Sequence, residues 1–96
     1  MKGKQKAYLR GLANNLEPLW QVGKGGITEN VINQLLDALE ARELIKINVL
    51  RNSPLETKEA AEELAEKTGA ELIQVIGNKV TLYKRARKDV KIILPE

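Results

Sequence analysis

The sequence predicts an α/β fold: a single compact domain in which helices pack on a four-stranded mixed sheet, with the elements in the order α-β-α-β-α-β-β. Three observations predict it. Stretches with apolar residues at helical spacing alternate with short β-rich runs. The dipeptide Gly77-Asn78 separates the last two runs, as the turn of a β-hairpin does. The chain has 96 residues, 43% of them hydrophobic, which is enough for one core but not for a second domain.

The sequence predicts the bounds of three helices and four strands. Helices are expected at residues 4–14, 28–42 and 57–68, and strands at residues 19–22, 44–50, 72–76 and 79–83. The first helix ends before Pro18, because proline disfavours a helical residue in front of it. Thr28 is placed to cap the second helix, and Gly69 to end the third.

The predicted sheet has one apolar face and one more polar face, because residues of opposite character alternate along its strands. The apolar face is expected to hold Ile45, Ile47, Val49, Ile73, Val75, Val80 and Leu82, and the polar face Lys46, Asn48, Gln74, Thr81 and Tyr83. The helices should therefore lie mainly on one side of the sheet. Residues 92–94 are compatible with a last strand and with a docked tail, and the sequence does not decide between them.

Basic residues gather at both ends of the chain and acidic residues in its middle. Residues 1–28 and 72–96 each have a net charge of +4, whereas residues 29–71 have a net charge of −5. Residues 84–88 alone carry four positive charges. If the two ends meet in the fold, they form one positive face of the kind that attracts nucleic acid. The alternative is that mixed charge only keeps a small domain in solution.

The composition argues against several classes of protein. The chain has no Cys, which removes disulfides and thiolate metal sites, and no His, which removes the commonest metal ligand and general base. The acidic residues of helix 57–68 follow no spacing that would converge on a metal ion. No apolar run approaches the roughly 18 residues of a membrane span, and residues 1–6 lead into no signal-type apolar region. The composition therefore argues against hydrolytic and metal-dependent catalysis, and we expect a cytoplasmic protein without metal, cofactor, small-molecule substrate or membrane contact.

A glycine-rich loop, Gly23-Lys24-Gly25-Gly26, joins the first strand to the second helix. Glycine backbone can come close to a ligand, and the free N–H groups at the start of the next helix are donors for an anion, so the loop could cradle a phosphate. Its spacing matches neither the mononucleotide nor the dinucleotide loop. What remains is the four-residue G-x-x-G form that clamps a nucleic-acid backbone, against the plainer alternative of an ordinary turn.

Several short motifs follow one another in a recognisable order. They are Leu9-Arg10-x-Leu12-Ala13, Gln21-Val22-Gly23-Lys24-x-Gly26, Glu43-Leu44-Ile45-Lys46-Ile47, Thr68-Gly69, Gln74-Val75-Ile76-Gly77 and Leu82-Tyr83-Lys84-Arg85. In this order they resemble the CRM domain (chloroplast RNA splicing and ribosome maturation) over about residues 4–86, and the chain is similar to the stand-alone bacterial YhbY-like members. The resemblance implies a single RNA-binding domain over residues 1–96, with a basic tail at 84–96 and a fold similar to the C-terminal domain of translation initiation factor three.

The resemblance also implies which residues contact RNA. The G-x-x-G loop maps onto Gly23, Lys24, Gly25 and Gly26, and the basic surface of the family onto Lys6, Arg10, Lys84 and Arg85. Lys46, Arg87 and Lys88 are added to this set for their charge. Tyr83, expected on the polar face of the sheet, is the aromatic residue best placed to stack on a base.

The function implied by the resemblance is RNA binding without catalysis. The expected target is ribosomal RNA in precursors of the large ribosomal subunit, with ribosomal proteins as further partners. The alternative is an adaptor that docks a basic ribosomal protein on the acidic helix around Glu59 to Glu66.

Overall fold

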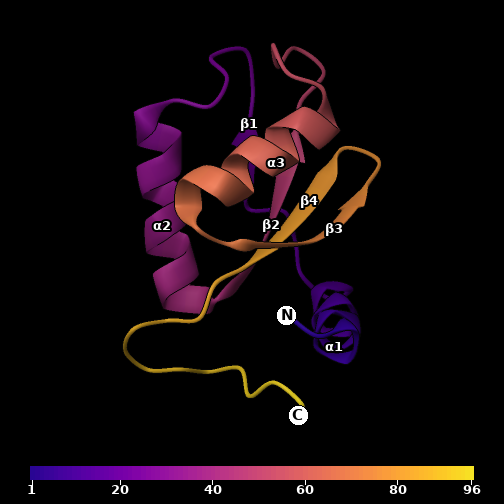
Figure 1. Cartoon of the computed structure of the whole chain (residues 1–96). Helices are drawn as coiled ribbons and strands as arrows, with labels where there is room; N and C mark the ends of the chain where they lie inside the picture. Colours follow the sequence, from indigo (N-terminus) through magenta and orange to yellow (C-terminus); the bar gives the residue numbers. More distant parts are fainter.

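The computed structural model describes all 96 residues and has three helices and four strands in the predicted order (Figure 1). The helices are α1 (Gly3–Ala13), α2 (Glu29–Arg42) and α3 (Thr57–Thr68), and the strands are β1 (Trp20–Val22), β2 (Leu44–Val49), β3 (Glu71–Ile76) and β4 (Lys79–Tyr83). The ends of these elements lie within about one residue of the positions expected from the sequence. The predicted fold class is confirmed.

Local signals set the ends of several elements. The Thr28 hydroxyl accepts a hydrogen bond from the N–H of Val31 at 3.2 Å and caps α2. Gly69 ends α3 with a left-handed φ of 75°. Gly77 has a φ of 58°, which a type II′ turn requires at its first central position. None of the three helices is long and apolar enough to cross a membrane.

The strands form one mixed sheet in the order β1-β2-β4-β3, in which β1 is parallel to β2 and the other neighbours are antiparallel. Because β1 and β2 run in the same direction, the loops that follow them lie at the same end of the sheet (Figure 1). The chain leaves β4 at the opposite end, where α1 also lies. We call these the loop end and the tail end.

Helices cover both faces of the sheet, but unequally. Helices α2 and α3 pack on one face and enclose the main core, whose largest buried residues include Leu35, Leu39, Ile45, Ile47, Leu64 and Leu82. Helix α1 packs on the second face, where Leu9, Ala13, Leu44, Ile73 and Tyr83 form a smaller core. The expectation that helices lie mainly on one side therefore holds for α2 and α3, and α1 is the exception.

Three expectations that rest on strand alternation are wrong: the burial of Val75, which is 37% exposed, the place of Ile73 and the exposure of Tyr83. A β-bulge between Leu72 and Gln74 shifts the register of β3, so Leu72 pairs with Leu82 and Ile73 packs beneath α1 instead of joining the main core. Tyr83 lies on the second face as expected, but α1 covers it and leaves it only 5% exposed. Its burial removes the exposed ring face that stacking on a base requires.

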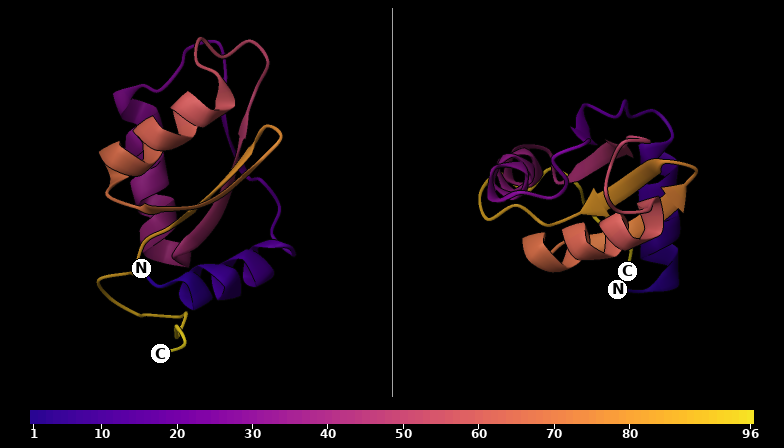
Figure 2. Two further views of the ribbon diagram at one scale, coloured as in Figure 1. Left: turned by 45° about the vertical axis from the view of Figure 1, so that its right-hand side comes forward. Right: turned by 90° about the horizontal axis from the view of Figure 1, so that it is seen from above.

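Residues 84–96 form neither helix nor strand and dock on the domain as a tail. Ile92 and Leu94 pack against the smaller core. The Gln5 side-chain amide donates to the Pro95 carbonyl oxygen at 3.0 Å, which ties the tail to α1. The two ends of the chain therefore meet, as Figure 2 shows.

Candidate nucleic-acid interface

The glycine loop closes as a tight turn at the loop end of the sheet. The N–H of Gly26 donates to the carbonyl oxygen of Gly23 at 2.9 Å, and Gly26 adopts a φ of 71°. A Cβ atom at Gly26 would lie 3.1 Å from the Pro54 ring, whereas a Cβ atom at Gly25 would meet nothing within 4 Å. Gly26 is therefore needed to build the turn, and Gly25 faces open space.

Lys24 and Gly25 form the exposed tip of this loop. Their N–H groups donate to no acceptor in the protein. The Lys24 ammonium has no ion-pair partner, because the one salt bridge of the molecule joins Lys67 and Glu63. Two free backbone donors beside a free cation form a site suited to an anion such as a phosphate group.

A second loop lies against the glycine loop and adds another cation. The N–H of Leu50 donates to the Val22 carbonyl oxygen at 2.8 Å, and a Cβ atom at Gly23 would lie 3.4 Å from the Leu50 side chain. Arg51 follows directly and is exposed. Sequence reasoning missed Arg51. The available signal was the pairing of two parallel strands, which brings the loops after them to the same edge of the sheet.

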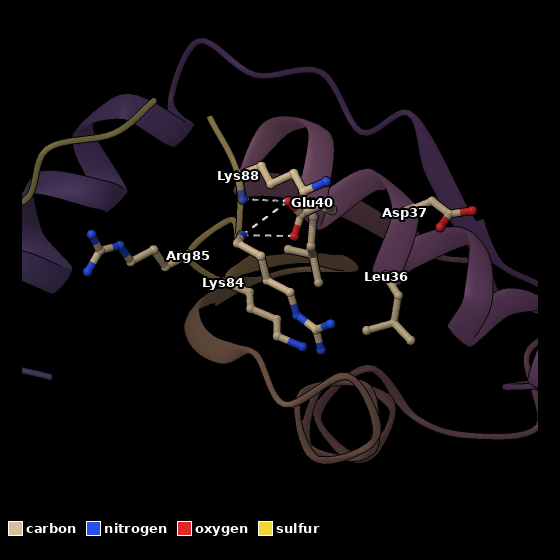
Figure 3. Close-up of a pocket in the computed structure, with 8 residues that line it drawn as sticks. Leu36, Asp37, Glu40, Lys84, Arg85 and Lys88 are labelled. Atoms are coloured by element: carbon tan, nitrogen blue, oxygen red, sulfur yellow. Dashed lines mark hydrogen bonds between the residues drawn. The ribbon is translucent and has the colours of Figure 1, made fainter. Parts of the chain in front are cut away.

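The basic residues of α1 and of the tail lie at the opposite end. Arg10 is exposed and Lys6 is half-buried. The Lys84 ammonium donates to the Thr68 carbonyl oxygen at 2.8 Å, so it satisfies the C-terminal end of α3 and already has a structural partner. Arg85 is exposed and is one of the residues that line the pocket drawn in Figure 3.

A pocket of about 450 Å³ separates α2 from the tail (Figure 3). Its lining consists of Leu36, Asp37, Leu39, Glu40, Lys84, Arg85, Arg87 and Lys88. The Glu40 carboxylate accepts hydrogen bonds from the N–H groups of Arg87 at 3.0 Å and Lys88 at 3.1 Å. These bonds hold the pKa of Glu40 below its usual range. Glu40 thus fixes the backbone of the basic run, while the side chains of Arg87 and Lys88 stay exposed.

Glu43 is the buried anchor of the tail. Its carboxylate, at 0% exposure, accepts the N–H groups of Ala86 and Lys91 at 2.8 Å and of Ile92 at 2.7 Å. Burial alone would raise the pKa of Glu43, but these three bonds outweigh it and hold the pKa below its usual range. Sequence reasoning missed this role, because the partners are 43 to 49 residues away along the chain.

The predicted RNA contacts are therefore divided among three places. The glycine loop lies at the loop end, and Lys6, Arg10, Tyr83, Lys84, Arg85, Arg87 and Lys88 belong to the tail end, with Tyr83 buried there. Lys46 lies between them on the second face of the sheet. Strand β2 has six residues, so at about 3.3 Å per residue the two ends are roughly 20 Å apart.

A model of the CRS1/YhbY (CRM) domain matches residues 1–84. The chain belongs to this family. The Bacillus subtilis protein named "Probable RNA-binding protein YqeI" is 46% identical over 95 residues, and the match covers 99% of both chains. A Haemophilus influenzae protein named "RNA-binding protein" is 39% identical over 93 residues, which cover 96% of this chain and 92% of that one.

A solved structure of a similar protein has the same fold. The solution structure of a Staphylococcus aureus protein, for which RNA binding has been suggested, superimposes with a TM-score of 0.82 at 52% identity and covers 99% of both chains. The family model ends at residue 84, but the B. subtilis and S. aureus proteins match almost the whole chain. The tail held by Glu40 and Glu43 therefore lies within the region shared with these two relatives.

Proposed function

We propose that this CRM-domain protein binds RNA without catalysing a reaction on it, and that its target is ribosomal RNA in cytoplasmic precursors of the large ribosomal subunit. The observation that carries the proposal is the exposed loop tip, where the N–H groups of Lys24 and Gly25 and the Lys24 ammonium have no partner in the protein. Two relatives are named RNA-binding proteins, which supports RNA as the ligand. The ribosomal target rests on the resemblance to stand-alone YhbY-like proteins.

Few of the Lys and Arg side chains form salt bridges within the protein, which supports an anionic partner. The chain has 16 Lys and Arg residues, and the one salt bridge uses only Lys67. None of the other cations forms a salt bridge with an Asp or Glu side chain, although Arg87 and Lys91 lie near enough to Glu40 for their charges to lower its pKa. Phosphates that replace water and counterions around such cations provide sequence-independent affinity.

Contacts of the glycine loop and contacts of the tail end contribute differently to RNA binding. The loop holds consecutive phosphates through backbone donors and Lys24, and the cations of the tail end add attraction without fixing register. Tyr83 is buried, and Trp20 is half-buried with the Arg42 guanidinium 5.6 Å above its ring, so neither ring is free to stack on a base. Tyr8 on α1, at 44% exposure, is the aromatic residue that remains accessible.

The double substitution Lys24→Asp with Gly25→Asp tests the proposal. Gly25 has no positive φ and open space beside it, so the fold should persist, as circular dichroism would show. A matched control, Asn33→Asp with Gln34→Glu and Ala41→Glu, makes the same change in net charge on the exposed surface of α2. Losing two or more charge-assisted contacts should weaken binding of a fluorescent single-stranded RNA more than tenfold, and the control should weaken it far less.

RNA binding that survives the loop substitutions would contradict the proposal. If the folded loop variant binds RNA and enters pre-ribosomal particles as well as the wild type does, the glycine loop is only a turn. The adaptor function of the acidic residues on α3 then becomes the better hypothesis.

A further inference from the structure

The second face of the sheet is only partly covered. Helix α1 lies across its tail end, over Leu44, Ile73 and Tyr83 (Figure 2). Toward the loop end, a pocket of about 200 Å³ opens on this face. It is lined by Asn14 at the end of α1 and by Lys46, Gln74, Ile76, Lys79 and Thr81 on three strands.

The lining combines groups that no other pocket of the molecule combines. It has two ammonium groups, two amides, one hydroxyl and an isoleucine that is 60% exposed, and it has no carboxylate. The pocket between α2 and the tail contains Asp37 and Glu40, and the pocket beside the second loop contains Glu56. A fourth pocket, between α1 and the tail, also has no carboxylate, but its lining is mostly apolar and its one cation is Arg85. The sheet pocket is therefore positive, and it also offers both donors and acceptors.

The polar groups of this pocket are unused within the protein. None of its side chains takes part in a hydrogen bond or a salt bridge with another protein group. The ammonium, amide and hydroxyl groups that line the pocket are therefore free to bind a ligand.

We propose that this pocket holds one unpaired nucleotide of the bound RNA. The inference rests on the proposed function and deepens it, because it assigns base contacts to a protein whose other contacts are to phosphate. Lys46 and Lys79 bind the flanking phosphates, the amides of Asn14 and Gln74 hydrogen-bond to the base edge, and Ile76 packs on the base.

The size and position of the pocket fit this occupant. Its volume of about 200 Å³ is below the roughly 300–1,000 Å³ of pockets for drug-sized ligands, which limits the occupant to a small group such as one base. It lies between the glycine loop and α1, on the path that an RNA strand would take to contact both basic ends. The bases of an RNA duplex are stacked and their Watson–Crick edges are paired, so a base that enters the pocket must come from a single-stranded segment.

The test compares two ligands of equal length: a single-stranded RNA 12-mer and an abasic oligomer with the same ribose–phosphate backbone. Gln74→Glu places a carboxylate in the pocket, and Ile76→Ser removes its apolar contact. Gln34→Glu on α2 and Ile93→Ser in the tail are matched controls, because both residues are exposed elsewhere on the surface. Base contacts of ordinary strength predict that the wild type and both controls bind RNA about tenfold more tightly than the abasic oligomer.

In Gln74→Glu and Ile76→Ser that preference should fall to less than about threefold. A preference that is unchanged in both variants, with abasic binding intact, would overturn the pocket and leave the proposed function standing. A wild type that binds neither oligomer would overturn both. As a second measurement on the unmodified protein, the side-chain NH₂ signals of Asn14 and Gln74 should shift with RNA but not with the abasic oligomer. Equal shifts with both ligands would contradict the base contact.

Discussion

The loop end and the tail end of the sheet both carry positive charge, but they present it differently. At the loop end the N–H groups of Lys24 and Gly25 are free, so backbone and side chain can both bind. At the tail end the N–H groups of Arg87 and Lys88 are already bonded to Glu40, so only their side chains remain for a ligand. The comparison teaches that the loop can position a phosphate by its geometry, whereas the tail attracts phosphates through charge that salt screens.

The largest expected effect concerns the anchor of the tail. Glu43→Ala leaves three N–H groups without their acceptor, and we expect the free energy of unfolding to fall by about 3 kcal/mol or more. Urea denaturation at neutral pH measures this free energy. Glu40→Ala, which removes an exposed acceptor, should lower the free energy of unfolding much less. A loss below about 1 kcal/mol for Glu43→Ala would show that this docking does not stabilise the domain.

The tail should act on RNA through charge alone. Replacing Arg85, Arg87 and Lys88 with Gln should lower affinity for all RNAs alike by about tenfold, because contacts to phosphate carry no sequence information. The plot of log affinity against log salt should become less steep by about 2 for single-stranded RNA. Selective loss for one RNA sequence would instead show that the basic run reads bases.

Alanine substitutions at the adjacent residues Gly25 and Gly26 should differ in their effect on stability, because only Gly26 has a backbone conformation that the turn requires. Gly26→Ala forces a side chain into a positive φ next to Pro54 and should destabilise the domain by about 1–2 kcal/mol. Gly25→Ala meets nothing within 4 Å and should leave thermal stability unchanged. Equal melting temperatures for the two variants would mean that the turn does not depend on Gly26.

Acid should loosen the tail end before the loop end. The pKa values of Glu40 and Glu43 in the folded protein lie below the ordinary value of 4.5, so the stability they contribute is present above that pH and is lost as the pH falls through their folded-state pKa values. The protection of the amides of Ala86, Lys91 and Ile92 against exchange, relative to the intrinsic exchange rate at each pH, should therefore fall below about pH 4.5. In Glu43→Gln this loss of protection with pH should be smaller, and an unchanged pH profile would contradict the role of the carboxylate.

The sequence was sufficient where structure depends on neighbouring residues. Thr28 capped α2, and Gly69 and Gly77 marked turns, because each acts within a few residues. It was insufficient where distant segments decide the outcome. The bulge that turns Ile73 beneath α1 depends on pairing with β4, and Glu43 acts on a tail more than 40 residues away.

The same limit applies to the site. The glycine loop could be proposed from one short motif, whereas Arg51 lies beside it only because β1 and β2 run in parallel. Tyr83 occupies a position that the alternating pattern of its strand assigns to the polar face. It is buried only because α1 docks over it.

Nuclear magnetic resonance of the backbone amides tests the central comparison most directly. During titration with a single-stranded RNA, the N–H signals of Lys24 and Gly25 should show the largest hydrogen-bond shifts, because they are free in the protein. Those of Arg87 and Lys88 should stay close to their starting positions, because Glu40 already accepts them. Saturation with RNA that leaves the amides of Lys24 and Gly25 unmoved would contradict the account.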